Sequence, residues 1–160
     1  MAVDMFLKLG SVTGASKDKI HANEINVLAW SGGLTNSGST QGGSDAGIGR
    51  VSLQGLKVTK FADRSTPNVM PACCDGSHFD GAQLAVRKAG GFPVEYLKVQ
   101  MSKMFVTRVS TEDSYSDSRL TENVMLNFER VTVDYTPPDE KGAACKPIPF
   151  ALDFAGNSGE

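Results

Sequence analysis

The side chains that could carry out catalysis are few in this chain. Its only histidines are His21 and His78. A serine nucleophile needs a base beside it and an acidic group to orient that base. Ser31, in the run Ala-Trp-Ser-Gly-Gly, lies outside the Gly-x-Ser-x-Gly pattern of a nucleophile elbow. His21 follows the charged turn Lys17-Asp18-Lys19, so we expect a solvated or strand-edge histidine. We therefore assign no catalytic residue and predict that the protein is not an enzyme.

The cysteines do not indicate a disulfide framework or a metal site. Cys73 and Cys74 are neighbours, and Cys145 makes the number odd. Free thiols in a reducing cytoplasm are the expected state. A structural metal site would need ligands at spacings such as Cys-x-x-Cys or His-x-x-x-His, which the sequence lacks. No Lys-Ser or Lys-Thr pair follows the glycines at 42–49 to form a phosphate loop. We expect no metal and no cofactor.

Size and charge restrict the partners. A chain of 160 residues with 40% hydrophobic content fits one domain, residues 1–160. The formal charge of -2 does not suit nucleic acid, which requires a concentrated basic surface. No run approaches the roughly 20 apolar residues of a membrane-spanning helix. Asp4 and Lys8 interrupt the apolar residues at the start, so we expect no signal peptide.

The elements that must position any site are mostly strands. In the first strand Val3, Met5, Leu7 and Leu9 share one face, while Phe6 adds an apolar side chain to the other. Glu24–Trp30 also alternates, with Ile25, Val27 and Ala29 on one face and Leu28 and Trp30 on the other. Strands that are apolar on both faces predict buried contacts on both sides, within the chain or with another subunit.

Three further strands change phase along their length. The phase changes at Gly55 in 50–61, between Tyr96 and Leu97 in 94–101, and between Phe128 and Val131 in 123–135. Such changes are typical of β-bulges, which bend a sheet. We therefore expect a mainly β fold, a closed or strongly curled antiparallel β-barrel with one short α-helix at its side.

The helix and the loops complete this expectation. Ser65 or Thr66 can cap a helix that has Pro67 in its first turn and a stop at Asp75-Gly76, with Pro71 keeping it short or distorted. An extended Gly/Ser-rich loop is predicted at 32–50, a polar connection at 110–119 and a Pro-interrupted C-terminal arm at 136–160.

A set of short segments, weak individually, occurs in a specific order over nearly the whole chain. They are Ala2–Leu9, Gly14–Lys19 with His21, Glu24–Ser31, Lys60 with Asp63–Asn68, Gly76–His78, Arg87–Gly91, Leu120–Val124 and Val133–Tyr135. Together they resemble the haemolysin-coregulated protein (Hcp) family of bacterial type VI secretion. The resemblance implies a structural subunit that forms hexameric rings. The rings stack into a hollow tube, tipped by a spike protein and expelled by contraction of a surrounding sheath.

The resemblance also implies roles for particular residues. Effector proteins would be bound and carried in the lumen, with Ser31 and Trp30 as candidate cargo contacts. Phe6 and Leu28 are candidates for the interface between subunits. The ring-stacking candidates in the loop are Ser39, Gln41, Ser44 and Asp45. The protein would lie in the bacterial cytoplasm before firing and then reach the extracellular space or a target cell without a signal peptide.

Two other classes of function remain open from the sequence. The alternative is a free secreted β-barrel binding module, such as an adhesin or a glycan-binding protein. A phage-type tail-tube subunit would be a close structural variant of the first reading. A homo-hexamer separates the tube subunit from the free module, which would stay monomeric.

Overall fold

The computed structural model describes residues 3–36, 51–90, 93–113, 118–154 and 158–159. These residues form nine strands and one helix, and every strand pair is antiparallel. In chain order they are β1 (Val3–Leu9), β2 (Ile25–Asn26), β3 (Ala29–Asn36), β4 (Val51–Phe61), α1 (Thr66–Asp75), β5 (His78–Lys88), β6 (Glu95–Glu112), β7 (Thr121–Tyr135), β8 (Ile148–Asp153) and β9 (Ser158–Gly159).

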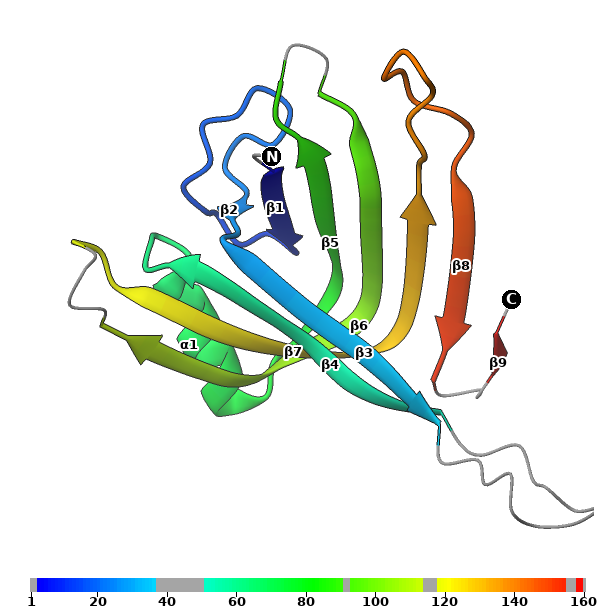
Figure 1. Cartoon of the computed structure of the whole chain (residues 1–160). Helices are drawn as coiled ribbons and strands as arrows, with labels where there is room; N and C mark the ends of the chain where they lie inside the picture. Colours follow the sequence, from blue (N-terminus) through cyan, green and yellow to red (C-terminus); the bar gives the residue numbers. More distant parts are fainter. Residues whose placement is uncertain (1–2, 37–50, 91–92, 114–117, 155–157, 160) are drawn as a thin grey trace, which may run out of the picture.

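The strands form one sheet with the order β2-β1-β5-β6-β7-β4-β3, and β8 joins β7 with β9 beyond it. The long strands β6 and β7 run through two parts of this sheet (Figure 1). The later half of β7 pairs with β8, and its earlier half pairs with β4. The sheet therefore bends across β6 and β7, so that β3 and β4 cross in front of the part that holds β1 and β5.

Closure of the sheet into a barrel is not confirmed. No strand ladder joins β3 to β2 within the ranges that the structure describes. The connection between β2 and β3 does contact β1 and β4, because Val27 N donates to Met5 O at 2.9 Å and Leu28 N donates to Thr59 O at 2.8 Å. The fold is a mainly β, bent antiparallel sheet with one short helix.

Two of the predicted phase changes are bulges. Gly55 has a φ of +75°, and the β3–β4 register shifts between Gly32 and Leu34, which face Leu56 and Leu53. The β5–β6 register shifts where Val86 and Arg87 face Leu97 and Glu95, leaving Tyr96 as the extra residue. The phase changes in the strand sequences therefore predict the positions of these bulges, where the sheet bends.

The third phase change marks the bend itself. In β7 the buried positions change from Phe128 to Val131, and in β6 they change from Met101 to Met104. Lys103, opposite this point, has a φ of +49°. The register shift of this strand pair lies farther along, between Val106 and Arg108. The inward-facing phase therefore changes at the same place in the two longest strands, β6 and β7, so that both keep their apolar residues on the inner side beyond the bend.

Helix α1 follows its predicted limits. Ser65 occupies the N-cap, Pro67 lies in the first turn and Gly76 ends the helix in the left-handed conformation. The helix has ten residues, which is short as expected, and it continues through Pro71 to Asp75. Val69 and Ala72 are buried in the core.

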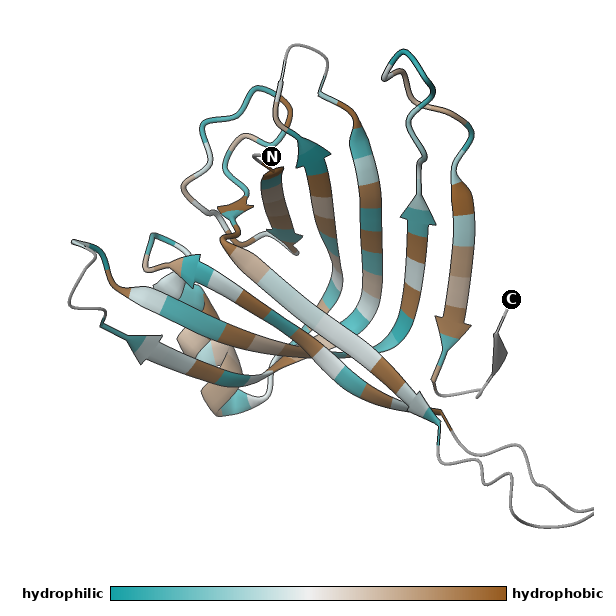
Figure 2. Ribbon diagram, viewed as in Figure 1, coloured by the Kyte–Doolittle hydropathy of each residue, from teal (hydrophilic) through white to brown (hydrophobic). Residues whose placement is uncertain are grey.

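The core lies on the inner face of the bent sheet. Figure 2 shows the hydrophobic and hydrophilic bands that alternate along the strands. Leu7, Leu84, Met104, Leu126 and Val58 are almost completely buried there. Because one domain-sized core of this kind is present, burial of apolar side chains is the main source of stability.

The core also encloses an ion pair. Lys60 Nζ lies 2.7 Å from Glu122 Oε2 and 3.1 Å from Asp63 Oδ1, and it donates to Phe61 O at 3.0 Å. Thr66 Oγ1 at the start of α1 donates to the same Glu122 oxygen at 2.9 Å. The pair therefore ties β4, β7 and the helix together.

Some element limits differ from the prediction. The strand expected over 24–30 is divided into β2 and β3, and residues 32–36, predicted as the start of the long loop, belong to β3. The rest of that loop, 37–50, lies outside the described residues. The C-terminal arm contains β8, with Pro149 opposite Asp134. No helix among the described residues is long and apolar enough to span a membrane.

Candidate functional site

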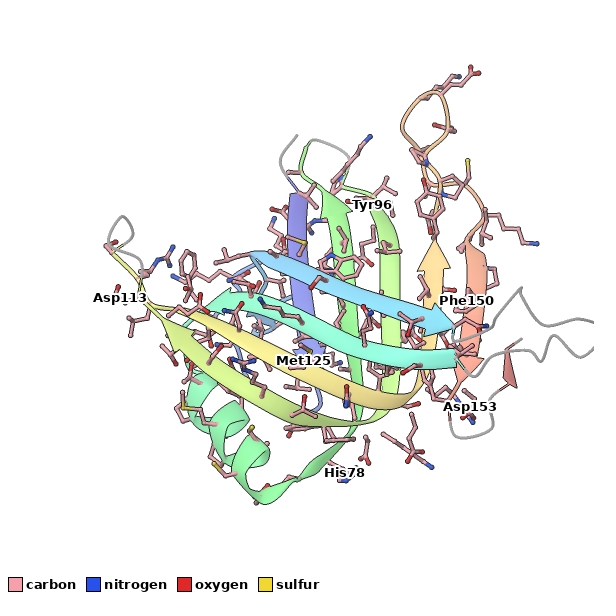
Figure 3. All side chains as sticks on the ribbon, turned by 60° about the horizontal axis from the view of Figure 1, so that its bottom comes forward. His78, Tyr96, Asp113, Met125, Phe150 and Asp153 are labelled. Carbon is pink, nitrogen blue, oxygen red and sulfur yellow. The ribbon has the colours of Figure 1, made fainter. Side chains whose placement is uncertain are left out.

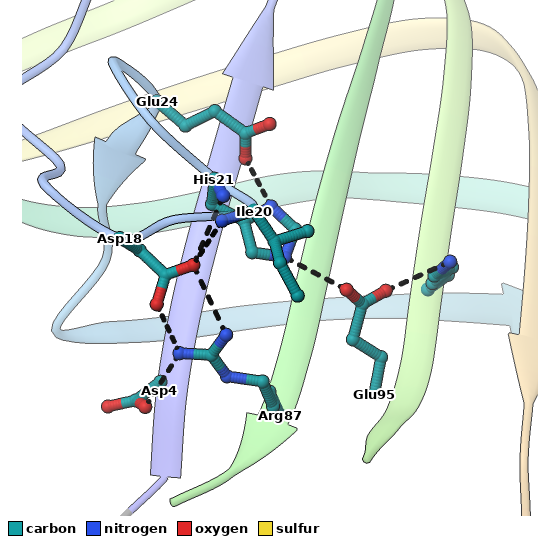
Figure 4. A network of polar contacts seen from close by, with 8 residues as sticks. Asp4, Asp18, Ile20, His21, Glu24, Arg87 and Glu95 are labelled. Carbon is teal, nitrogen blue, oxygen red and sulfur yellow. Dashed lines mark hydrogen bonds and ion pairs between the residues drawn. The ribbon is translucent and has the colours of Figure 1, made fainter. Parts of the chain in front are cut away.

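A polar network surrounds His21, between the segment after β1 and the strands β1, β5 and β6 (Figure 4). His21 is 3% exposed. Its Nδ1 lies 2.8 Å from Glu24 Oε2 and its Nε2 lies 2.9 Å from Glu95 Oε1. Glu95 also contacts Lys98 Nζ at 2.9 Å. The expectation of a solvated or strand-edge histidine is wrong, because His21 is buried and lies outside the strands. The turn that carries it folds back on the sheet and reaches a carboxylate 74 residues away in the sequence.

Arg87 and Phe6 complete the network. Arg87 donates to both oxygens of Asp18, at 3.2 and 2.6 Å, and to Asp4 Oδ2 at 3.1 Å. The guanidinium lies 5.0 Å from the centroid of the Phe6 ring, and His21 stacks on this ring at 4.5 Å. Hydrogen bonds from Arg87 and from the Ile20 and His21 amides hold the pKa of Asp18 well below its usual range.

The chemistry of this network is structural. Both ring nitrogens of His21 already face carboxylates, so the ring has no free nitrogen to act as a base for a nucleophile. No group of three or more His, Cys, Asp or Glu side chains in the described residues could hold a metal ion. The network fixes the segment 10–24 against the strands.

The cargo candidates Ser31 and Trp30 lie on opposite faces of β3. Trp30 pairs with Val58 and packs against the core, whereas Ser31 pairs with Lys57 and is exposed. Since neighbouring side chains on a strand point to opposite faces, Ser31 and Trp30 cannot both belong to one cargo-binding surface. Of the two, only Ser31 is on the exposed face of β3, β4, β7 and β6.

The exposed face around Ser31 is hollowed and basic. Lys57 and Arg108 both pair with Met125, so a cross-strand row runs Ser31, Lys57, Met125, Arg108. Met125 lies in the middle of this face in Figure 3. A depression of about 200 Å³ is lined by Lys57, Arg108, Ser110, Glu112, Asn123, Val124 and Met125.

Sequence reasoning missed Lys57 and Arg108. The phase of β4 gives a usable signal, because Lys57 lies between the inward residues Leu56 and Val58 and must therefore point outward. The register that aligns Lys57 with Arg108 depends on a bulge in β6 and could be read only from the folded sheet.

The two interface candidates differ in exposure. Phe6 is 5% exposed and is covered by His21 and Arg87 of its own chain, so it presents little surface to a neighbour. Leu28 is 41% exposed. The loop candidates Ser39, Gln41, Ser44 and Asp45 lie outside the described residues.

The core remains uncovered at the β8 edge. Phe150 pairs with Val133, and Ile148 pairs with Tyr135, so these residues continue the sheet rows of Val99 and Leu97. Phe150 is nevertheless 45% exposed and Ile148 60% exposed. An apolar hollow of about 470 Å³ lies nearby at the strand ends, lined in part by Val3, Tyr96, Tyr135 and Pro138.

Comparison with known proteins assigns the chain to a family. The family model described as type VI secretion system effector, Hcp, matches residues 6–135. The chain therefore belongs to the Hcp family, whose members are structural, secreted proteins of the type VI secretion system.

Individual relatives agree with this assignment. The chain is 54% identical to protein hcp1 of Pseudomonas aeruginosa over 144 residues, 89% of each chain. The crystal structure of Hcp1 from Salmonella typhimurium is similar over the full length of both chains, with 34% identity and a TM-score of 0.80. A structure described as a type six secretion system protein has a TM-score of 0.93 at 24% identity, over 99% of this chain and 100% of its own, and shows the shared fold.

Proposed function

We propose that this chain is the structural subunit of the type VI secretion inner tube. Six copies form a ring, and rings stack into a hollow tube, tipped by a spike protein, that sheath contraction expels. The subunit binds and carries effector proteins in the lumen and performs no catalysis. It lies in the bacterial cytoplasm before firing and reaches the extracellular space or a target cell through the contraction.

The observation that carries this proposal, besides the family, is the uncovered apolar edge at β8. Ile148 and Phe150 lie in register with rows of the sheet but remain about half exposed. A head-to-tail contact between copies uses two different patches and closes into a ring. An apolar strand edge that meets a different patch of the next copy meets this requirement.

The residue roles follow from the same arrangement. Ser31, on the exposed basic face, is the proposed cargo contact, and Leu28 is a proposed interface residue. Trp30 packs against the core and supports β3 from the opposite side. Ser39, Gln41, Ser44 and Asp45 are proposed to contact the next ring.

Light scattering after size-exclusion chromatography tests the proposal. A hexamer has six times the 17.0 kDa chain mass, or about 102 kDa. A constant monomer mass over a hundredfold range of protein concentration would contradict the tube subunit and favour a free binding module. Electron microscopy of the same sample is expected to show rings with an open centre.

A further inference from the structure

We propose that the row of Ser31, Lys57, Met125 and Arg108 is a binding site for carboxylate side chains of a carried protein. This inference rests on the proposed function, since that function places the face of β3, β4, β7 and β6 on the lumen. It adds the chemistry of the partner, an acidic polypeptide surface.

The first argument is that two cations on this face are unpaired. Among the described residues neither Lys57 nor Arg108 makes an ion pair, and both are exposed. Five other strand cations do contact carboxylates, namely Lys60, Arg87, Lys98, Lys103 and Arg130, whereas Lys8 on β1 and Lys88 on β5 make no ion pair among the described residues. The two positive charges of the row are therefore available to an outside anion.

The second argument is their spacing. Lys57 and Arg108 flank Met125 on the neighbouring strands, so their Cα atoms lie about 10 Å apart, twice the strand separation. Both side chains line the same depression, which has Met125 and Val124 among its apolar lining residues. Long, flexible cations at this distance can converge on one carboxylate, and Arg108 can hold it with two parallel hydrogen bonds.

The third argument is that the charge of the depression is opposite in sign to the net charge of the whole chain. The chain carries a net charge of -2, yet this depression holds two cations and a single carboxylate, Glu112. Nearby, the Arg119 guanidinium lies 4.0 Å from the centroid of the Phe61 ring and adds another cation to this end of the sheet. Charge complementarity thus selects an acidic partner.

A protein surface suits the site better than a nucleic acid does. Nucleic acids are bound by long tracks of Lys and Arg that neutralise many phosphates, whereas this row offers two cations beside a carboxylate and a methionine. Each contact with an exposed cation is weak. Repetition of the site around a ring would make the binding multivalent, so that several weak contacts together hold the cargo inside the tube. The cargo would then leave once the ring dissociates and the contacts are no longer joined.

Fluorescence anisotropy tests the site directly. The probe is a fluorescein-labelled 20-residue poly-L-glutamate, titrated with the full chain in 50 mM NaCl. Lys57→Gln and Arg108→Gln are each expected to weaken binding about two- to five-fold, the range for exposed charge pairs, and the double variant about ten-fold. Binding should weaken further in 300 mM NaCl.

Matched controls neutralise exposed cations elsewhere. Lys8→Gln on β1 and Arg64→Gln before α1 are expected to bind the probe as the unmodified chain does. Equal binding by the double variant and the unmodified chain would overturn the site. Tighter binding of a labelled 20-nucleotide oligothymidine than of poly-L-glutamate would overturn the partner class.

Light scattering on the same samples separates this inference from the proposed function. A hexamer mass for all variants, with weaker probe binding only in the Lys57 and Arg108 variants, supports the site. A monomeric unmodified chain would overturn the tube subunit, while the anisotropy of that monomer still decides whether the row binds carboxylates.

Discussion

At the scale of single residues, the His21 network shows how a titratable side chain serves the fold. Both ring nitrogens lie within hydrogen-bond distance of carboxylate oxygens, those of Glu24 and Glu95. The ring also stacks on Phe6, which removes it from water. The network therefore joins charge pairing and packing at one point, where the segment 10–24 meets the sheet.

Glu95 gives this network a predictable dependence on pH. Burial opposes its ionised form, but hydrogen bonds from Lys98 and His21 outweigh burial and hold the pKa of Glu95 below its usual 4.5. The unfolded chain therefore takes up this proton at a higher pH than the folded chain does. The stability contributed by Glu95 is present above about pH 4.5 and is lost as the pH falls through the lower folded pKa.

We expect Glu95→Gln to lower the free energy of unfolding by about 1–3 kcal/mol at pH 7, as for a lost hydrogen bond to a charged group. The difference from the unmodified chain should shrink toward pH 3, which urea unfolding at several pH values measures. Glu129→Gln is the matched control, because Glu129 pairs with Lys103 at the surface and should change stability by less than about 0.5 kcal/mol. A difference that is the same at pH 3 and pH 7 would contradict the assignment.

Ser31 is the residue at which cargo binding can be tested without disturbing the fold. Ser31→Gln places a longer side chain on the exposed face beside Lys57, where no core contact is lost. Ring mass should be unchanged, while the cargo secreted per subunit falls about tenfold, equivalent to ~1.4 kcal/mol of binding. Ser11→Gln, at an exposed serine in the turn after β1, is the control. Unchanged cargo levels would remove Ser31 from the site.

At the scale of elements, Gly55 determines where β4 bends. Its φ is +75°, and an added Cβ would lie 2.7 Å from Asn127 Oδ1 and 3.0 Å from Leu126 O. We expect Gly55→Ala to destabilise the fold by about 1–3 kcal/mol through backbone strain and crowding. Thermal unfolding should show a drop of about 2–4 °C per kcal/mol for a chain of this size. In the control Gly81→Ala the added Cβ meets only Met101 O at 3.4 Å, so the unfolding temperature should stay near that of the unmodified chain.

Lys60 connects β4, β7 and α1, and its removal should loosen all of them. Lys60→Met leaves Glu122, which is 1% exposed, as a buried charge without its cation. We expect a loss of about 3–5 kcal/mol in urea unfolding. The double variant Lys60→Met/Glu122→Leu, which leaves neither charge of the pair, should recover part of this loss. A double variant as unstable as the sum of both single variants would contradict the pairing.

These elements also show what the sequence could predict. The bulges at Gly55 and Tyr96 and the ends of α1 depend on local signals: a change of phase, a proline and a capping glycine. The burial of His21 could not be predicted in this way, because its partner Glu95 arrives only when β5 and β6 have paired. Lys60 shares the phase of Leu56 and Val58, so its inward direction was readable, although its partner Glu122 was not.

At the scale of the whole molecule, the bent sheet leaves surfaces that a single chain does not cover. Strand β3 has a ladder only with β4 among the described residues, and large apolar side chains are exposed just before it, at Leu28, and within it, at Leu34. Strand β8, which branches from β7, exposes Ile148 and Phe150 at a separate edge. Two different sheet edges with exposed apolar side chains on one subunit suit a head-to-tail contact, in which one edge of each copy covers the other edge of the next copy.

Phe150 allows assembly to be separated from folding. Its side chain is 45% exposed at the β8 edge, so Phe150→Asp places a charge where the proposed neighbour would have to bury it. We expect the mass in light scattering to fall from six chains to one, while the circular dichroism of the sheet is retained. Phe150→Leu keeps an apolar side chain at the same position and should remain hexameric. A hexamer that persists in Phe150→Asp would show that ring contacts lie elsewhere, with the exposed Leu28 as the next position to substitute.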